Sequence, residues 1–176
     1  MTLFIFSEYY RRIIQKPITK TILITVILAI GLFATVKNAG TYANNIRNIN
    51  ECDVAAGVYL GSIAKPGDIA AVNDIGAIGY YSNMEIFDLW GLASPEMTRD
   101  MILNDSLAFE YMKTNKKINY MAIFPKWFKY LSGRDDIFKP LIILETENNT
   151  VLAEERTIVY KAFWQDTTNQ NYPESQ

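Results

Sequence analysis

The side chains best suited to binding a ligand lie in one stretch of thirty residues, from Asp68 to Met97. Asp74 follows a short apolar run, and Asp88 lies within a second run in which apolar and polar residues alternate. A carboxylate at such a position can accept hydrogen bonds from ligand hydroxyl groups or act as a base. Polar groups just beyond strand ends are also where α/β sheets place their binding sites.

Three aromatic residues accompany these carboxylates. Tyr80 and Tyr81 end a short segment, residues 75–82, that is predicted to be helical. Trp90 follows Asp88 by two residues, so a strand there would place both side chains on one face. An aromatic ring at such a place can stack on the ring of a sugar. The candidate ligand-binding residues are therefore Asp74, Tyr80, Tyr81, Asp88 and Trp90.

Each candidate also has a structural interpretation. Asp74 is well placed to cap the helix predicted over residues 75–82. A buried Asp88 would need a hydrogen-bonding partner, and the backbone amides of a neighbouring turn would supply one. Adjacent tyrosines at a helix end can divide into one core residue and one rim residue. The sequence leaves the structural and the ligand-binding interpretations open.

The composition excludes several kinds of site. The chain has no histidine, which excludes a Ser-His-Asp or Cys-His nucleophile and histidine-based metal centres. Its single cysteine, Cys52, cannot form an internal disulfide or a thiolate cluster. Gly76 and Gly79 lack the further residues of a phosphate-binding loop. The ordinary routes to a self-contained enzyme are therefore mostly closed, although chemistry by Asp, Glu, Tyr and Lys remains open. We predict no catalytic residue, no metal site and no cofactor.

Residues 21–36 form an uncharged run of sixteen residues between Lys20 and Lys37. With Ile18 and Thr19 the run extends to about 28 Å as a helix, against a hydrocarbon core of about 30 Å. The sequence thus predicts a transmembrane helix over residues 18–37. A cleaved signal peptide is the main alternative, although the small-residue cleavage pattern after the run is poor.

Basic residues are concentrated before this run, at Arg11, Arg12, Lys16 and Lys20. This asymmetry predicts a cytoplasmic amino terminus and an extracytoplasmic remainder. From residue 38 onward the charges sum to −6, and the whole chain carries −2. An acidic domain of this kind argues against nucleic-acid binding. The expected localisation is a single-pass membrane protein whose larger part lies outside.

The remainder of the chain alternates strand and helix patterns, which predicts an α/β domain. We expect strands over residues 69–72, 85–89, 118–124, 141–144 and 157–163, with helices over 41–61 and 75–82. Ser94 and Pro95 are expected to begin another helix. The first three strands should pair in parallel, and the last two should form an antiparallel hairpin at an edge. The predicted fold is a small three-layer α/β domain with a mostly parallel sheet of about five strands.

The predicted organisation has four parts. Residues 1–17 form a cytoplasmic lead-in, and residues 18–37 form the transmembrane helix. Residues 38–165 form the extracytoplasmic α/β domain, and residues 166–176 form a polar, flexible tail. Trp127 belongs to the aromatic segment after the third strand. It either takes part in ordinary helix packing or forms part of a lip that covers the membrane or a lipid-linked substrate.

The order of these elements resembles the extracytoplasmic carboxy-terminal domain of bacterial multi-spanning glycosyltransferases of the C superfamily. Mannosyltransferase-like and arabinosyltransferase-like enzymes belong to that superfamily. The likeness covers roughly residues 20–125. Its motif, D-x-G-x-x-x-Y-Y followed by D-L-x-G-L, is matched here by Asp74, Gly76, Tyr80, Tyr81, Asp88, Leu89, Gly91 and Leu92.

The resemblance implies a role in the cell envelope with polyprenyl-phosphate-linked sugars. Such enzymes carry their catalytic acids in a loop between amino-terminal membrane helices, and this chain has no such loop. The expectation is therefore a carboxy-terminal domain or truncated member that is not catalytic alone. The alternative is a single-pass accessory module that binds a glycan, a lipid or a partner. The expected partners are the lipid bilayer and either a lipid-linked sugar or a membrane-embedded protein.

Overall fold

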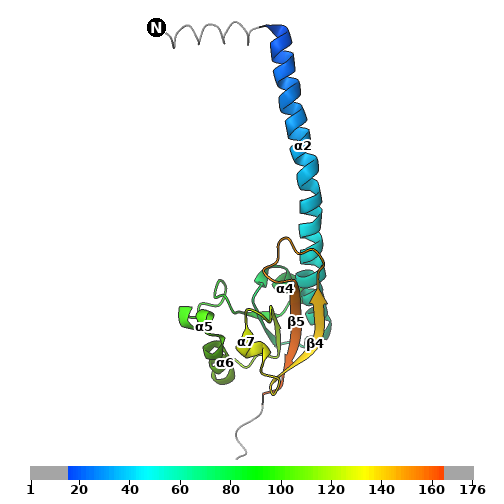
Figure 1. Cartoon of the computed structure of the whole chain (residues 1–176). Coiled ribbons are helices and arrows are strands. Elements are labelled where there is room, and N and C mark those ends of the chain that lie inside the picture. The colour runs from blue at the N-terminus through cyan, green and yellow to red at the C-terminus, as the bar shows by residue number, and fades with distance from the viewer. Residues whose placement is uncertain (1–15, 165–176) are drawn as a thin grey trace, which may run out of the picture. The chain divides into compact units, whose positions relative to one another are not determined.

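The structure, a computed structural model, describes residues 16–164 (Figure 1). The predicted tail and most of the predicted cytoplasmic lead-in, residues 1–15, therefore lie outside the described residues. The chain divides into two compact units between Ala43 and Asn44. Helix α2, Pro17–Ile49, supplies residues to both units.

The first unit contains the apolar part of α2. By length and composition this helix is able to cross a membrane. Its apolar side chains are exposed, as at Leu32 (67%) and Phe33 (71%). An apolar surface of this extent needs a cover, and a bilayer would supply it. The structure thus confirms one membrane-spanning candidate near the amino terminus, without indicating its orientation.

Three threonines within this helix bond their hydroxyl groups to the helix backbone. Thr21, Thr25 and Thr35 each donate to the carbonyl oxygen four residues earlier, over 2.9–3.0 Å. A hydroxyl group in hydrocarbon has no water to bond, so an internal acceptor removes most of its burial cost. These polar residues are therefore compatible with a membrane environment.

In the second unit the helical path continues beyond α2. A π-helical turn, η1 (Asn50–Val54), leads directly into α3 (Ala55–Ile63). The helix predicted over residues 41–61 is thus confirmed as helical throughout, with a π turn in its middle. In η1 both Cys52 and Asp53 are buried.

A five-stranded sheet forms the centre of the second unit. Its strand order is β2-β1-β3-β5-β4. The strands span, in that order, Glu85–Asp88, Ile69–Val72, Tyr120–Ile123, Arg156–Ala162 and Phe138–Glu145. Strands β2, β1 and β3 pair in parallel, whereas β5 pairs antiparallel to both β3 and β4. Strands β4 and β5 form the predicted hairpin, and they lie side by side in Figure 1.

Helices cover both faces of the sheet, and each face has its own apolar core. Helices α3 and α4 (Ile75–Ser82) pack on the face that carries Ala70, Val72 and Ala122. On the other face a larger core surrounds Phe87, Phe109 and Met121. That face is covered by α5 (Arg99–Leu103), α6 (Asp105–Thr114) and α7 (Lys129–Ser132). The predicted three-layer α/β fold is confirmed.

The helix start predicted at Ser94 and Pro95 is wrong. Helix α5 begins at Arg99 and is capped by Thr98, whose hydroxyl accepts the Met101 N–H. The Ser94 hydroxyl is buried and accepts the Asp88 N–H over 2.8 Å. The same residue types suit a helix cap and a tight turn. Here the backbone N–H of Asp88, at the end of β2, needs an acceptor, and the Ser94 hydroxyl supplies it in a turn.

Candidate functional site

A pocket of about 470 Å³ lies at the carboxyl ends of the parallel strands. Residues that follow β1, β2 and β3 line it, among them Asn73, Trp90 and Phe124. Strand β1 continues to β2 on one side and, later in the chain, has β3 on its other side. Such a reversal leaves a crevice at the carboxyl edge of a sheet, where α/β folds bind their ligands. The volume is within the ordinary range for small-molecule sites.

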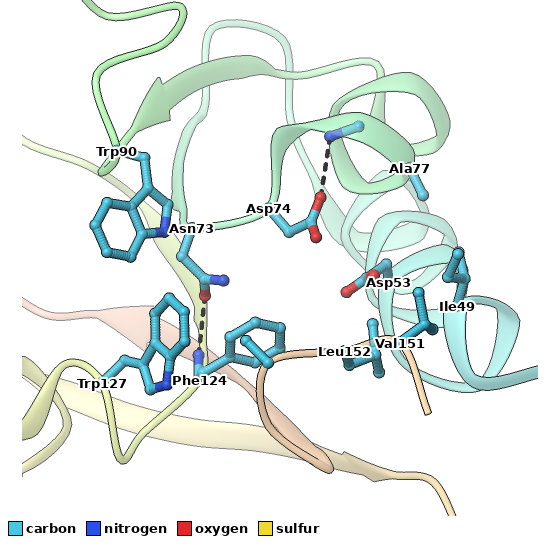
Figure 2. A pocket seen from close by; sticks show the side chains of 12 residues that line it. Ile49, Asp53, Asn73, Asp74, Ala77, Trp90, Phe124, Trp127, Val151 and Leu152 are labelled. Atoms are coloured by element: carbon cyan, nitrogen blue, oxygen red, sulfur yellow. Dashed lines mark hydrogen bonds between the residues drawn. The ribbon is translucent and has the colours of Figure 1, made fainter. Parts of the chain in front are cut away.

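Asn73 ties the ends of β1 and β3 together. Its side-chain oxygen accepts the backbone N–H of Phe124 over 2.9 Å, and both residues are buried. This bond replaces the sheet pairing that is lost where the two strands diverge. This part of the pocket lining is therefore held by a side chain as well as by the strands (Figure 2).

Asp74 follows directly and caps helix α4. Its Oδ1 accepts the Gly76 N–H over 3.4 Å, which makes it the predicted helix cap. The same carboxylate also lines the pocket. Capping engages one oxygen, so the other stays available to a ligand. The structural and the ligand-binding interpretations of Asp74 are therefore compatible.

Asp53 approaches the pocket from the π turn and faces Asp74 in Figure 2. It is 3% exposed, and its Oδ1 has no hydrogen-bond partner within the part of the chain that the structure describes. Burial, and to a smaller extent the negative charge of Asp74, raise the pKa of its carboxyl to about 7. A buried carboxyl without a partner is costly to a fold, which makes it a strong indicator of a binding site.

Two indole rings form another part of the lining. The rings of Trp90 and Trp127 meet edge to face, with centroids 5.3 Å apart and an interplanar angle of 87°. Phe124 contacts Trp127 in similar geometry at 6.0 Å. Trp127 is 48% exposed, so part of its surface is open to a ligand. Figure 2 shows the indoles on one side of the pocket and the two carboxylates on the other.

The last wall comes from the loop between β4 and β5, through Val151, Leu152 and Ala153. Strand β4 ends, and β5 begins, at the edge where the three parallel strands end, which brings this loop to the pocket. A polar cluster holds the loop to the end of α2. Buried Asn48 donates to the Thr146 hydroxyl over 2.7 Å and accepts the Thr150 N–H over 2.9 Å.

Of the five candidate residues, the structure brings Asp74 and Trp90 together in this pocket. Asp88 is fully buried and does not line it. Its oxygens accept the N–H groups of Trp90 at 2.9 Å and Ala93 at 2.8 Å. Asp88 thus shapes the turn that carries Trp90, and it acts on the site through that indole.

Tyr80 and Tyr81 lie outside the pocket lining. They are 81% and 48% exposed on α4, and their rings contact each other edge to face at 5.1 Å. The division into a core and a rim residue is therefore not observed, because both side chains are exposed. Neither tyrosine lines the pocket together with Trp90.

Sequence reasoning missed Asp53 as a site residue. The sequence feature that could have indicated Asp53 is an acid between Cys52 and Val54, directly before an apolar stretch predicted to be helical. That pattern also suits a solvent-facing helix position. The pocket loop was missed as well, because residues 151–153 approach the site through the pairing of β4 with β5.

These features define the domain as a mixed α/β sheet with an acidic and aromatic pocket at its carboxyl edge. Among families of known proteins, the model described as a domain of unknown function, DUF8728, matches residues 41–173. The match covers about three quarters of the chain, which therefore belongs to this family. No curated protein and no solved structure matches the chain.

Proposed function

We propose that this chain is a membrane-anchored, extracytoplasmic domain that binds the sugar part of polyprenyl-phosphate-linked glycans. In this role it serves as the carboxy-terminal domain of a membrane glycosyltransferase, or a truncated member, and is not catalytic alone. The pocket is the observation that carries the proposal, because it combines indole faces with carboxylates. A sugar ring offers C–H groups to an aromatic face and hydroxyl donors to carboxylate oxygens.

The test is sugar binding by the full chain in detergent micelles. Isothermal titration would compare a panel of methyl glycosides with a short-chain polyprenyl-phosphate sugar. We expect binding that Trp127→Ala weakens by about tenfold, as for the loss of one aromatic contact of about 1 kcal/mol or slightly more. Transfer of the sugar to an acceptor by the chain alone would contradict the non-catalytic role.

Tyr80→Ala is the matched control. Both residues are exposed aromatics, but Tyr80 contacts Tyr81 and does not line the pocket. We expect this variant to bind as the parent chain does. If Tyr80→Ala weakened binding and Trp127→Ala did not, the ligand site would be on α4 and the pocket would be rejected as the sugar site.

A second candidate function is a self-contained accessory module that holds a glycan, lipid or partner at the membrane. One observation favours it: all residues that line the pocket belong to the unit from Asn44 onward. Such a module would bind its ligand without a catalytic membrane part. Tight binding by the chain alone favours the module, whereas binding that appears on co-expression with a multi-spanning membrane protein favours the glycosyltransferase domain.

A further inference from the structure

The pocket presents negative charge that the described residues lining it do not balance. Asp53 and Asp74 both line it, and the described lining includes no lysine or arginine. Two basic residues near the lining in sequence are paired with other acids: Lys126 with Glu155 at 3.3 Å, and Arg47 with Glu51 at 3.4 Å. Two carboxylates at close range disfavour joint ionisation, so a cation between them would lower the free energy of the site.

Asp53 provides an independent indication of a ligand-binding site. Its side chain is almost completely buried and is aimed into the pocket. Its Oδ1 has no hydrogen-bond partner among the described residues. An acceptor that is orphaned in the protein is satisfied when a ligand brings a donor.

We propose that the pocket recognises a primary ammonium group, held between the carboxylates of Asp53 and Asp74. The body of the ligand then lies against Trp90 and Trp127. If the ammonium group belongs to an amino sugar, the inference rests on the proposed function and specifies the substrate class of that function. The same ammonium chemistry occurs in an ethanolamine lipid headgroup, and the experiment separates these two sources.

An ammonium group fits this site better than a metal ion. It carries three N–H donors, which two carboxylates can accept at the distances of charge-assisted hydrogen bonds. A divalent ion such as Ca²⁺ takes six to eight oxygen ligands, and the described residues contain no group of three or more candidate metal-binding side chains. The ring faces of Trp90 and Trp127 attract organic cations as well.

The experiment is titration of the full chain in micelles at pH 7 with matched ligands. The probes are glucosamine, glucose and N-acetylglucosamine, the corresponding galactose series, and ethanolamine. We expect an amino sugar to bind at least about tenfold more tightly than its neutral and acetylated analogues. Asp53→Asn should abolish that preference, since it removes the charge and keeps the shape.

Glu110→Gln is the matched control variant, because Glu110 is an exposed acid on α6 that does not line the pocket. It should leave the amino-sugar preference unchanged, and thermal unfolding would confirm that Asp53→Asn is folded. Equal loss of preference in both variants would indicate a general charge effect and overturn the inference.

The outcomes separate the two proposals. Equal affinity for glucosamine, glucose and N-acetylglucosamine would overturn the ammonium site and leave sugar binding intact. Binding of ethanolamine without any sugar would support the ammonium site and reject the carbohydrate function. Displacement of glucosamine by Ca²⁺ at similar concentration would show a metal site instead, and no binding of any probe would reject both proposals.

Discussion

At the residue scale, the most unusual group in this protein is the Asp53 carboxyl. It lies in a π turn, and turns of this kind within longer helices are frequent at functional sites. The acid Asp74, which caps helix α4, lies near it, whereas Cys52 precedes it on its own turn. Burial raises the pKa of the Cys52 thiol to about 11, with Asp53 adding to the rise. Both groups are therefore held towards their protonated forms.

The raised pKa of Asp53 predicts a pH dependence of stability. The folded-state pKa is about 7 and the ordinary value 3.8, so between these the folded protein keeps a proton that the unfolded chain has lost. Stability therefore falls as the pH rises from about 4 to about 7, by up to about 4 kcal/mol. Asp53→Asn removes this loss, so its free energy of unfolding should improve relative to the parent between pH 4 and pH 8.

Denaturant titration of both chains, followed by tryptophan fluorescence, measures this difference. The comparison across pH cancels any constant effect of the new amide. Glu110→Gln should show no such trend, because its side chain is exposed. A stability difference between Asp53→Asn and the parent that stays constant from pH 4 to pH 8 would contradict the raised pKa.

At the element scale, the pocket depends on a loop that has little regular structure of its own. Residues 146–155 connect β4 to β5 and supply one wall of the site. Buried Asn48, at the end of α2, bonds Thr146 and Thr150 at the beginning and the middle of this connection. The Thr146 hydroxyl in turn donates to Glu51 over 2.6 Å. The loop is thus positioned by helix side chains.

Asn48→Ala tests this dependence. It leaves the part-buried Thr150 N–H and the buried Thr146 hydroxyl without their Asn48 bonds, so we expect a loss of about 1–3 kcal/mol in the free energy of unfolding. Ligand affinity should fall as well, because the wall of the pocket loosens. Hydrogen exchange of the amides in residues 147–155 would measure that loosening directly.

Asn115→Ala is the control for this variant. The Asn115 side chain is exposed, and its bonds to Thr114 and Tyr111 are local to the end of α6. We expect a change within about 0.5 kcal/mol and no effect on exchange in the loop. Unchanged exchange in Asn48→Ala would show that the loop is held by other contacts.

At the scale of the whole molecule, the chain joins an exposed apolar helix to an acidic α/β unit. The apolar helix side chains, unlike those of the two cores, have no protein partner in the described chain. The excess of basic residues before the helix predicts a cytoplasmic amino terminus. This arrangement would present the pocket to the extracytoplasmic side, where the proposed glycan ligands are used.

Reporter fusions at residue 176 test the orientation. We expect activity from a reporter that functions outside the cytoplasm, and none from one that functions inside. Exchanging Arg11, Arg12 and Lys16 for neutral residues should reduce the first signal, since it removes the charge asymmetry. Activity of the cytoplasmic reporter in the unaltered chain would reject the assigned topology, and with it an extracytoplasmic site.

The sequence by itself determined the elements of this protein. Uncharged residues 21–36 are too apolar and too long a run for an ordinary surface helix. Alternation of apolar and polar residues indicates a strand at Glu85–Asp88, and a short apolar run indicates one at Ile69–Val72. Asp74 was recognisable as a helix cap because capping depends on neighbours in sequence. Local periodicity and capping are properties of short segments, which explains why the fold class could be predicted.

The tertiary structure decided which residues form the pocket. Asp53, Asp74, Trp90, Trp127 and the loop at Leu152 are distant in sequence, and strand order together with the β4–β5 hairpin brings them to one edge. It also separated Tyr80 and Tyr81 from that site, although they are close to Asp74 in the chain. Burial and missing partners depend on every surrounding element, so the exceptional state of Asp53 emerges only when the chain is folded.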